Sequence, residues 1–152
     1  MIAGAAAGTL VSGRTDPRAL ALFALLGAIA DVDLAFEMHS GPTHSLTVAA
    51  AAGVVAWTIT RRVRLALAVA AAYATHTLLD WLSTDDSPPI GIMALWPFTR
   101  DYYESSLHVF LAISRRYWLA QAWLGNLRAV IREVLILGPF LWIAWWVRSR
   151  SA

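Results

Sequence analysis

The sequence alternates long apolar stretches with short breaks that hold most of its charged residues. Residues 1–11 are small and apolar and predict a short packed helix, which a polar break at residues 12–18 follows. Within this break Asp16-Pro17 is typical of a helix start, with Asp as the N-cap and Pro at the first helical position. The later apolar stretches predict helices over residues 17–36, 44–60, about 65–83, and 134–147 with its flanks.

Two further stretches have a different pattern. Residues 84–104 form the longest polar stretch and predict a loop. Residues 105–132 are amphipathic, with arginines among aromatic side chains. We interpret this second stretch as one or two helices that lie at a membrane interface or pack on the bundle.

Composition places these helices in a membrane. The chain has 152 residues, of which 59% are hydrophobic and 14% charged, and its mean hydropathy is +0.57. That is too apolar for an ordinary soluble domain of this length. The chain has room for about four to five membrane-length helices. The predicted fold class is therefore all-α: a polytopic membrane helix bundle in which residues 1–152 form a single integral-membrane domain.

The arginines orient the predicted bundle. All twelve basic residues are arginine, and the formal net charge is only +2. They cluster between apolar segments, as membrane-flanking charges do, so we expect the bilayer as a partner and no nucleic acid. The sequence leaves the oligomeric state open. The positive-inside tendency places seven arginines on the cytoplasmic side of the plasma (inner) membrane: Arg14, Arg18, Arg61, Arg62, Arg64, Arg148 and Arg150.

Candidate chemistry gathers around the histidines. His76 and Asp80 are four residues apart, so on a helix they point to the same side. Imidazole and carboxylate are natural ligands of a divalent metal such as zinc. An up-down-up path of the first three long helices would bring six side chains to one membrane face, where we predict a polar metal pocket for one or two ions on the outer side: Asp31, Asp33, His39, His44, His76 and Asp80.

The residues alone leave several alternatives open. His76 and Asp80 could form only a hydrogen bond that fixes a tautomer. Asp31 and Asp33 point to nearly opposite sides of a regular helix, so either the helix breaks there or one binds metal and the other orients a neighbour. His39 could be a ligand of a second metal, an acid or base, or a loop residue. Arg100 could anchor the chain at the interface or clamp a phosphate.

A set of short motifs over about residues 20–100 resembles the YdjM-like family of small integral-membrane proteins, which are described as predicted metal-dependent hydrolases. These motifs are Asp31-Val-Asp33, His39-Ser-Gly-Pro-Thr-His44, His76-Thr-Leu-Leu-Asp80 and Leu95-Trp96-Pro97-Phe98. The family is remotely similar to zinc-dependent phospholipase C and P1-type nucleases. This resemblance implies that Asp31 or Asp33, His44, His76 and Asp80 are metal ligands, with Asp80 bridging two ions.

Two departures from the family pattern affect the site. The family has Arg after the first His of its His-Arg-Gly-x-Thr-His motif, where this chain has Ser40. A phosphate contact is therefore missing or moved, with Arg100 as a replacement. Family members also carry a His near the N-terminus, whereas residues 1–10 have none, which puts a second ion in doubt.

The predicted function is that of a membrane-embedded metal-dependent hydrolase acting on a phosphoester in a lipid-like substrate that enters from the bilayer. Asp31, Asp33, His39 and Arg100 are the candidate catalytic residues, with an unligated carboxylate as proton acceptor. The alternative is a non-enzymatic membrane protein with a structural or regulatory metal site, which a closed coordination shell would favour. A transporter ranks last, because the alanine-rich middles of the helices offer almost no polar residues.

Overall fold

The structure, a computed structural model, describes residues 1–36, 40–86, 88–114, 116 and 118–150. Within these residues the chain has five α-helices, two short 3-10 helices and no β-strand, which confirms the all-α class and the expected number of helices. In chain order the elements are α1 (Ile2–Ser12), α2 (Pro17–Leu26), η1 (Ile29–Phe36), η2 (Pro42–His44), α3 (Leu46–Thr60), α4 (Val63–Trp81) and α5 (Ala120–Ser149).

Helix α2 starts as predicted but ends early. The Asp16 side chain accepts a hydrogen bond from the backbone N–H of Ala19 at 3.0 Å, which confirms the N-cap. The prediction of one helix over residues 17–36 is wrong, because α2 ends at Leu26 and the chain continues as η1. The break lies where Gly27 packs on α1, and a Cβ atom on Gly4 would come within 2.8 Å of the Gly27 Cα.

Helices α3 and α4 form an antiparallel pair. Ser45 caps α3 by accepting a hydrogen bond from the N–H of Val48 at 3.2 Å, and Arg61 ends it in the left-handed conformation with φ of 57°. Gly53 permits the close approach of the two helices, since a Cβ atom there would lie 2.9 Å from the Ala70 Cβ. Small residues at a helix contact are typical of membrane bundles.

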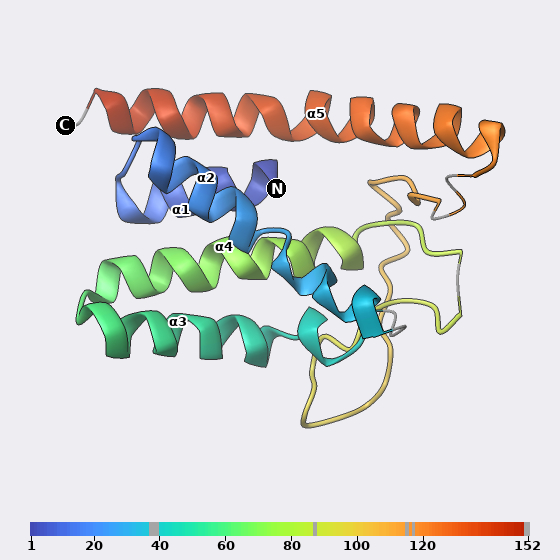
Figure 1. The fold of residues 1–152 in the computed structure, drawn as a ribbon, viewed down its shortest axis with the longest axis horizontal. Coiled ribbons are helices and arrows are strands. Elements are labelled where there is room, and N and C mark those ends of the chain that lie inside the picture. Colours follow the sequence, from blue (N-terminus) through green and yellow to red (C-terminus); the bar gives the residue numbers. More distant parts are fainter. Residues whose placement is uncertain (37–39, 87, 115, 117, 151–152) are drawn as a thin grey trace.

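The helices stack in layers (Figure 1). Helix α5 runs along one side of the molecule, α1 packs between α5 and α4, and α3 covers the opposite side of α4. A small core lies between α2 and α4, formed by Ala19, Phe23, Ala68, Val69 and Ala72. This arrangement brings the end of α2, η1, η2 and the end of α4 together at one end of the bundle.

The segment before α5 differs from its prediction. Residues 105–119 were expected to be helical, but where the structure describes them they are irregular, and α5 begins only at Ala120. The backbone of this segment forms hydrogen bonds with the end of α4. The N–H of Ser105 donates to the carbonyl of Trp81 at 2.8 Å, and the N–H of Val109 donates to the carbonyl of Leu82 at 2.7 Å. These tertiary hydrogen bonds replace those of a helix and override the amphipathic pattern.

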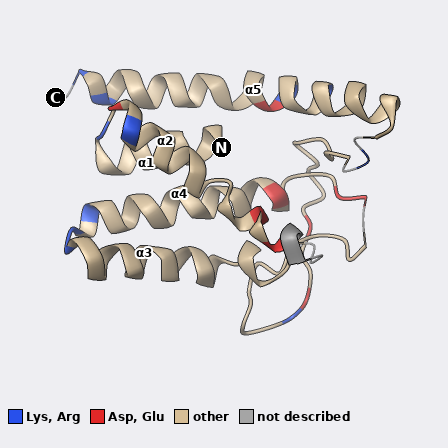
Figure 2. Cartoon of the chain, viewed as in Figure 1, with Lys and Arg blue, Asp and Glu red and all other residues tan. Residues whose placement is uncertain are grey.

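One helix among the described residues, α5, is long and apolar enough to cross a membrane, and only 11% of its most apolar stretch is buried. Helices α1, α2 and α3 are apolar but shorter, so the polytopic arrangement stays a prediction. Figure 2 shows the arginines of the helix ends gathered where α1, α3 and α5 finish, and most of the acidic residues toward the opposite end.

Candidate metal centre

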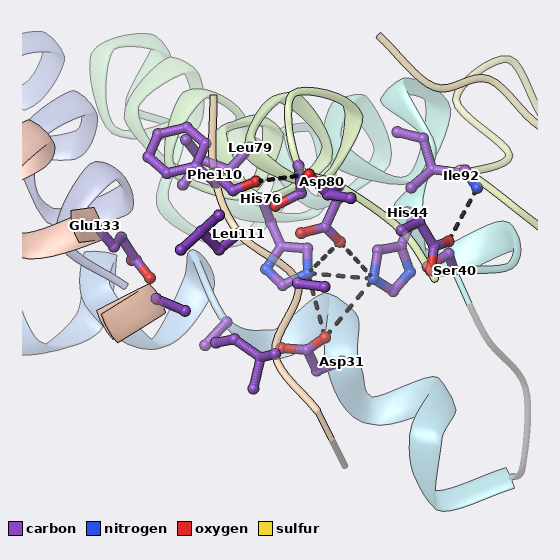
Figure 3. A pocket seen from close by; sticks show the side chains of 18 of the residues that line it. Asp31, Ser40, His44, His76, Leu79, Asp80, Ile92, Phe110, Leu111 and Glu133 are labelled. Atoms are coloured by element: carbon purple, nitrogen blue, oxygen red, sulfur yellow. Dashed lines mark hydrogen bonds and ion pairs between the residues drawn. The ribbon is translucent and has the colours of Figure 1, made fainter. Parts of the chain in front are cut away.

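Four side chains from three elements converge at the end of the bundle opposite the arginines (Figure 3). Asp31 belongs to η1, His44 to η2, and His76 and Asp80 to successive turns of α4. One potential ligand atom from each residue lies within 4.8 Å of all the others. We call these residues the His-Asp cluster, and its donor atoms could hold a metal ion.

The spacing of the donor atoms fits one small divalent ion. The Nε2 atoms of His44 and His76 are 3.2 Å apart, and each lies 3.1 Å from Oδ2 of Asp80. Oδ1 of Asp31 lies 3.3 Å from Nε2 of His76 and 3.7 Å from Nε2 of His44. A tetrahedral ion with bonds of about 2.0–2.1 Å separates its ligand atoms by roughly 3.3 Å, close to these five distances. The remaining pair, the carboxylate oxygens of Asp31 and Asp80, is the widest, and all four atoms lie within 4.8 Å of one another.

An oxygen acceptor holds the far nitrogen of each imidazole. Nδ1 of His76 lies 3.0 Å from the carbonyl oxygen of Gly27. Nδ1 of His44 lies 3.2 Å from Oδ2 of Asp33 and shares a hydrogen bond of 3.1 Å with the hydroxyl of Thr43. Because a carbonyl only accepts hydrogen bonds, Nδ1 of His76 carries a proton, and the carboxylate of Asp33 favours a proton on Nδ1 of His44 as well. In a neutral ring of this tautomer Nε2 presents its lone pair to the cluster. When both rings are neutral, two lone pairs and two carboxylates therefore face one point, an arrangement that a cation stabilises.

Neighbouring hydrogen bonds fix the position of His44. The N–H of Gly41 donates to Oδ2 of Asp33 at 3.1 Å, and the Tyr73 hydroxyl on α4 donates to the carbonyl of Thr43 at 2.8 Å. His44 itself is only 2% exposed. The short η2 helix is thus held from both sides, so the ring is set before any ligand binds.

Protons compete with a metal for the cluster. Burial alone would lower the pKa of His44, but the carboxylates of Asp31 and Asp80 outweigh it and raise this pKa from 6.5 to about 9. Burial would raise the pKa of Asp31, but hydrogen bonds from His44 and His76 outweigh it and hold this pKa well below its ordinary range. At neutral pH the metal-free cluster therefore keeps a proton on His44, which a metal must displace.

The cluster opens on a cavity of about 360 Å³. Leu79 of α4, Ile92 and residues 110–113 form much of its apolar wall, and α5 contributes Ala129 and Glu133. No arginine is among the described residues that line it. The ionisable side chains of the lining are all acidic or histidine: Asp31, His44, His76, Asp80, Asp85, Asp86 and Glu133.

A family model described as YdjM inner membrane protein matches residues 1–151. The chain belongs to the YdjM inner membrane protein family. This confirms the family that the motifs resemble, and the family's description agrees with the apolar composition and with α5 as a candidate span. No curated protein and no solved structure matches the chain.

The structure brings four of the predicted site residues of this YdjM family member together and separates the others from them. Asp33 is 1% exposed and contacts His44 on the side away from the cluster. The two aspartates of η1 are therefore placed differently, as helical geometry led us to expect, although their roles stay predictions. Arg100 is exposed and does not line the cavity, and His39 lies outside the described residues.

Three acidic residues of the cavity were not among the predicted site residues. Asp85 and Asp86 have the pattern of an ordinary polar turn, and only the folded loop brings them to the cavity. Glu133 carries a stronger signal, because it is the one acidic residue within the thirty residues of α5. An ionisable group in a membrane-length helix marks a functional site by default.

Proposed function

We propose that this YdjM family member is a membrane-embedded metal-dependent hydrolase that acts on a phosphoester in a lipid-like substrate. The observation that carries the proposal is the convergence of two imidazole nitrogens and two carboxylates on one point beside a cavity with an apolar wall. Zinc is the expected ion, because this donor set and its spacing suit tetrahedral coordination. An apolar wall beside a polar centre suits an amphiphile.

In the proposed reaction different residues would bind the metal, orient its ligands and accept a proton. His44, His76 and Asp80 would hold the ion, while the Gly27 carbonyl and Asp33 keep both rings in the correct tautomer. A bound divalent ion supplies polarisation of the phosphoryl oxygen and a lowered pKa for water. Asp31, which is about half exposed toward the cavity, could release one carboxylate oxygen to accept a proton.

The proposed setting is a polytopic bundle in the inner membrane with the cluster on the outer side. Support comes from the arginines at the opposite end of the bundle (Figure 2) and from the positive-inside tendency. From Arg64 to Asp80 the helix α4 rises roughly 24 Å at about 1.5 Å per residue. That length would place the cluster near headgroup depth, where a lipid phosphoester lies.

The test is hydrolysis by the purified protein of phospholipids presented in mixed detergent micelles. We expect release of phosphate or a phosphorylated headgroup that stops on chelation and returns with added zinc. His76→Ala should abolish it, and His108→Ala is the matched control, because His108 does not line the cavity. Activity that survives chelation and His76→Ala would refute the proposal.

One observation favours a second candidate, a structural or regulatory metal site without turnover. Four side chains already supply four donor atoms, and structural zinc sites are closed in this way, whereas catalytic ones keep an open position. Asp31→Ala separates the two candidates. A catalytic site should retain metal with this change, whereas a structural site should lose both the metal and thermal stability.

A further inference from the structure

Glu133 on α5 lies at the depth of the His-Asp cluster. Two arginines on different helices define a common level, because Arg64 donates to the carbonyl of Val11 and Arg148 to that of Leu10 at the end of α1. At about 1.5 Å per residue, α4 rises roughly 24 Å from Arg64 to Asp80. Along α5 the distance from Arg148 back to Glu133 is roughly 22 Å at the same rise of about 1.5 Å per residue. The two helices run antiparallel (Figure 1), so both carboxylates stand at a similar height.

Glu133 also belongs to the same cavity as the cluster. It lines the cavity from α5, while His76 and Asp80 line it from α4. In Figure 3 Glu133 and Ser40 lie at opposite ends of the pocket, with the cluster between them. A single cavity therefore has a metal-binding arrangement within it and an isolated carboxylate toward the end formed by α5.

Glu133 has no ion-pair partner among the described residues, although the Met1 terminus and the two histidines also line the cavity. Among the described residues none forms a hydrogen bond or ion pair with it, and no arginine of the described chain lines the cavity. The lining of the same cavity includes Leu111, Ile113 and Ala129, which are apolar. A partly buried carboxylate beside apolar groups is unfavourable unless a cationic group pairs with it.

We propose that Glu133 binds the cationic group of an amphiphile whose apolar part lies against the wall formed by residues 110–113. The ligand class is a primary, secondary or quaternary amine that carries an alkyl chain. Only the fate of the bound molecule rests on the proposed function: a substrate with a phosphoester at the cluster would carry its ammonium group at Glu133. Binding itself requires no hydrolysis.

The experiment measures calorimetric binding of octylammonium and of neutral octanol to zinc-supplemented full-length protein in an uncharged detergent. Glu133→Gln keeps the shape of the side chain and removes its charge. We expect it to weaken octylammonium binding about tenfold, the effect of one lost charge-assisted hydrogen bond, and to leave octanol binding unchanged. Asp101→Asn is the matched control, because Asp101 is exposed and does not line the cavity.

A second substitution at Glu133 tests the role of its charge independently. Glu133→Asp retains the charge and should retain most of the preference for octylammonium, whether or not Glu133→Gln folds well. Equal octylammonium binding by the wild type and Glu133→Gln, or an equal loss for both ligands, would overturn the proposal. A failure to hydrolyse phospholipids would count against the proposed function alone, because this readout does not depend on turnover.

Discussion

A methyl group added to Gly4 of α1 should disturb the candidate metal centre through two successive contacts, from Gly4 to Gly27 and from Gly27 to His76. Gly4 packs on the end of α2, and a Cβ atom there would lie 2.5 Å from the carbonyl oxygen of Phe23 and 2.8 Å from the Cα of Gly27. Both are backbone atoms, which cannot rotate aside. Because carbon atoms pack at about 3.5–4.0 Å, Gly4→Ala must push the Gly27 peptide away by roughly 1 Å.

That displacement exceeds what a metal site tolerates. The Gly27 carbonyl accepts the hydrogen bond from Nδ1 of His76 at 3.0 Å, so its movement turns or releases the ring. Metal–ligand distances in a working site hold to within about 0.2 Å. Loss of the partner that orients a ligating histidine typically lowers metal affinity by about 10–100-fold, and we expect Gly4→Ala to fall in this range.

The assay is zinc affinity by competition with a chromophoric chelator, with circular dichroism to show that the helices remain. Gly125→Ala is the matched control, because nothing lies within 4 Å of a Cβ atom built on Gly125 of α5. That change should leave zinc affinity unaltered and favour the helix by up to about 1 kcal/mol. Wild-type affinity in Gly4→Ala would refute the link from α1 through Gly27 to His76.

Three further outcomes are expected. His76→Ala and Asp80→Ala should each lose bound metal while retaining helical content, and unchanged metal content in both, measured by elemental analysis, would exclude the cluster. Asp33→Asn should lower zinc affinity about 10–100-fold by weakening its hold on His44, and the chelator competition would show an unaltered affinity if Asp33 only supports the fold. Metal-free protein should lose thermal stability as pH rises from 6.5 to about 9, because the raised pKa of His44 stabilises the fold only while the ring is protonated. Zinc-loaded protein should not follow this trend, and a melting temperature of the metal-free form that rises over the same range would contradict it.

Much of the candidate site was predictable because its geometry is local. The four-residue spacing of His76 and Asp80 requires only a helix to place both on one side, and α4 is that helix. The approach of His44 required only that α3 and α4 be antiparallel neighbours. The prolines, glycines and capping residues that begin and end these helices are equally local signals, and Asp16 illustrates them.

The features that escaped prediction depend on contacts between distant segments. The apolar pattern runs on through residues 27–36, and only the contact of Gly27 with Gly4 marks where α2 stops. The bonds of residues 105–110 to the end of α4 likewise leave no trace in the amphipathic pattern. Glu133 reaches the cavity because α5 packs on α1 at a particular register, which no motif records.

Arg64 of α4 and Arg148 of α5, which both donate to carbonyls at the end of α1, also bear on the order in which the molecule assembles. Arg64 and Arg148 follow their carbonyl partners by 53 and 138 positions in the chain, so the ribosome synthesises α1 long before either arginine exists. A helix of eleven residues, most of them Ala or Gly, buries little apolar surface by itself during that interval. Since α1 supports Gly27, and Gly27 orients His76, we expect the candidate metal centre to be complete only after α4 and α5 have both packed on α1.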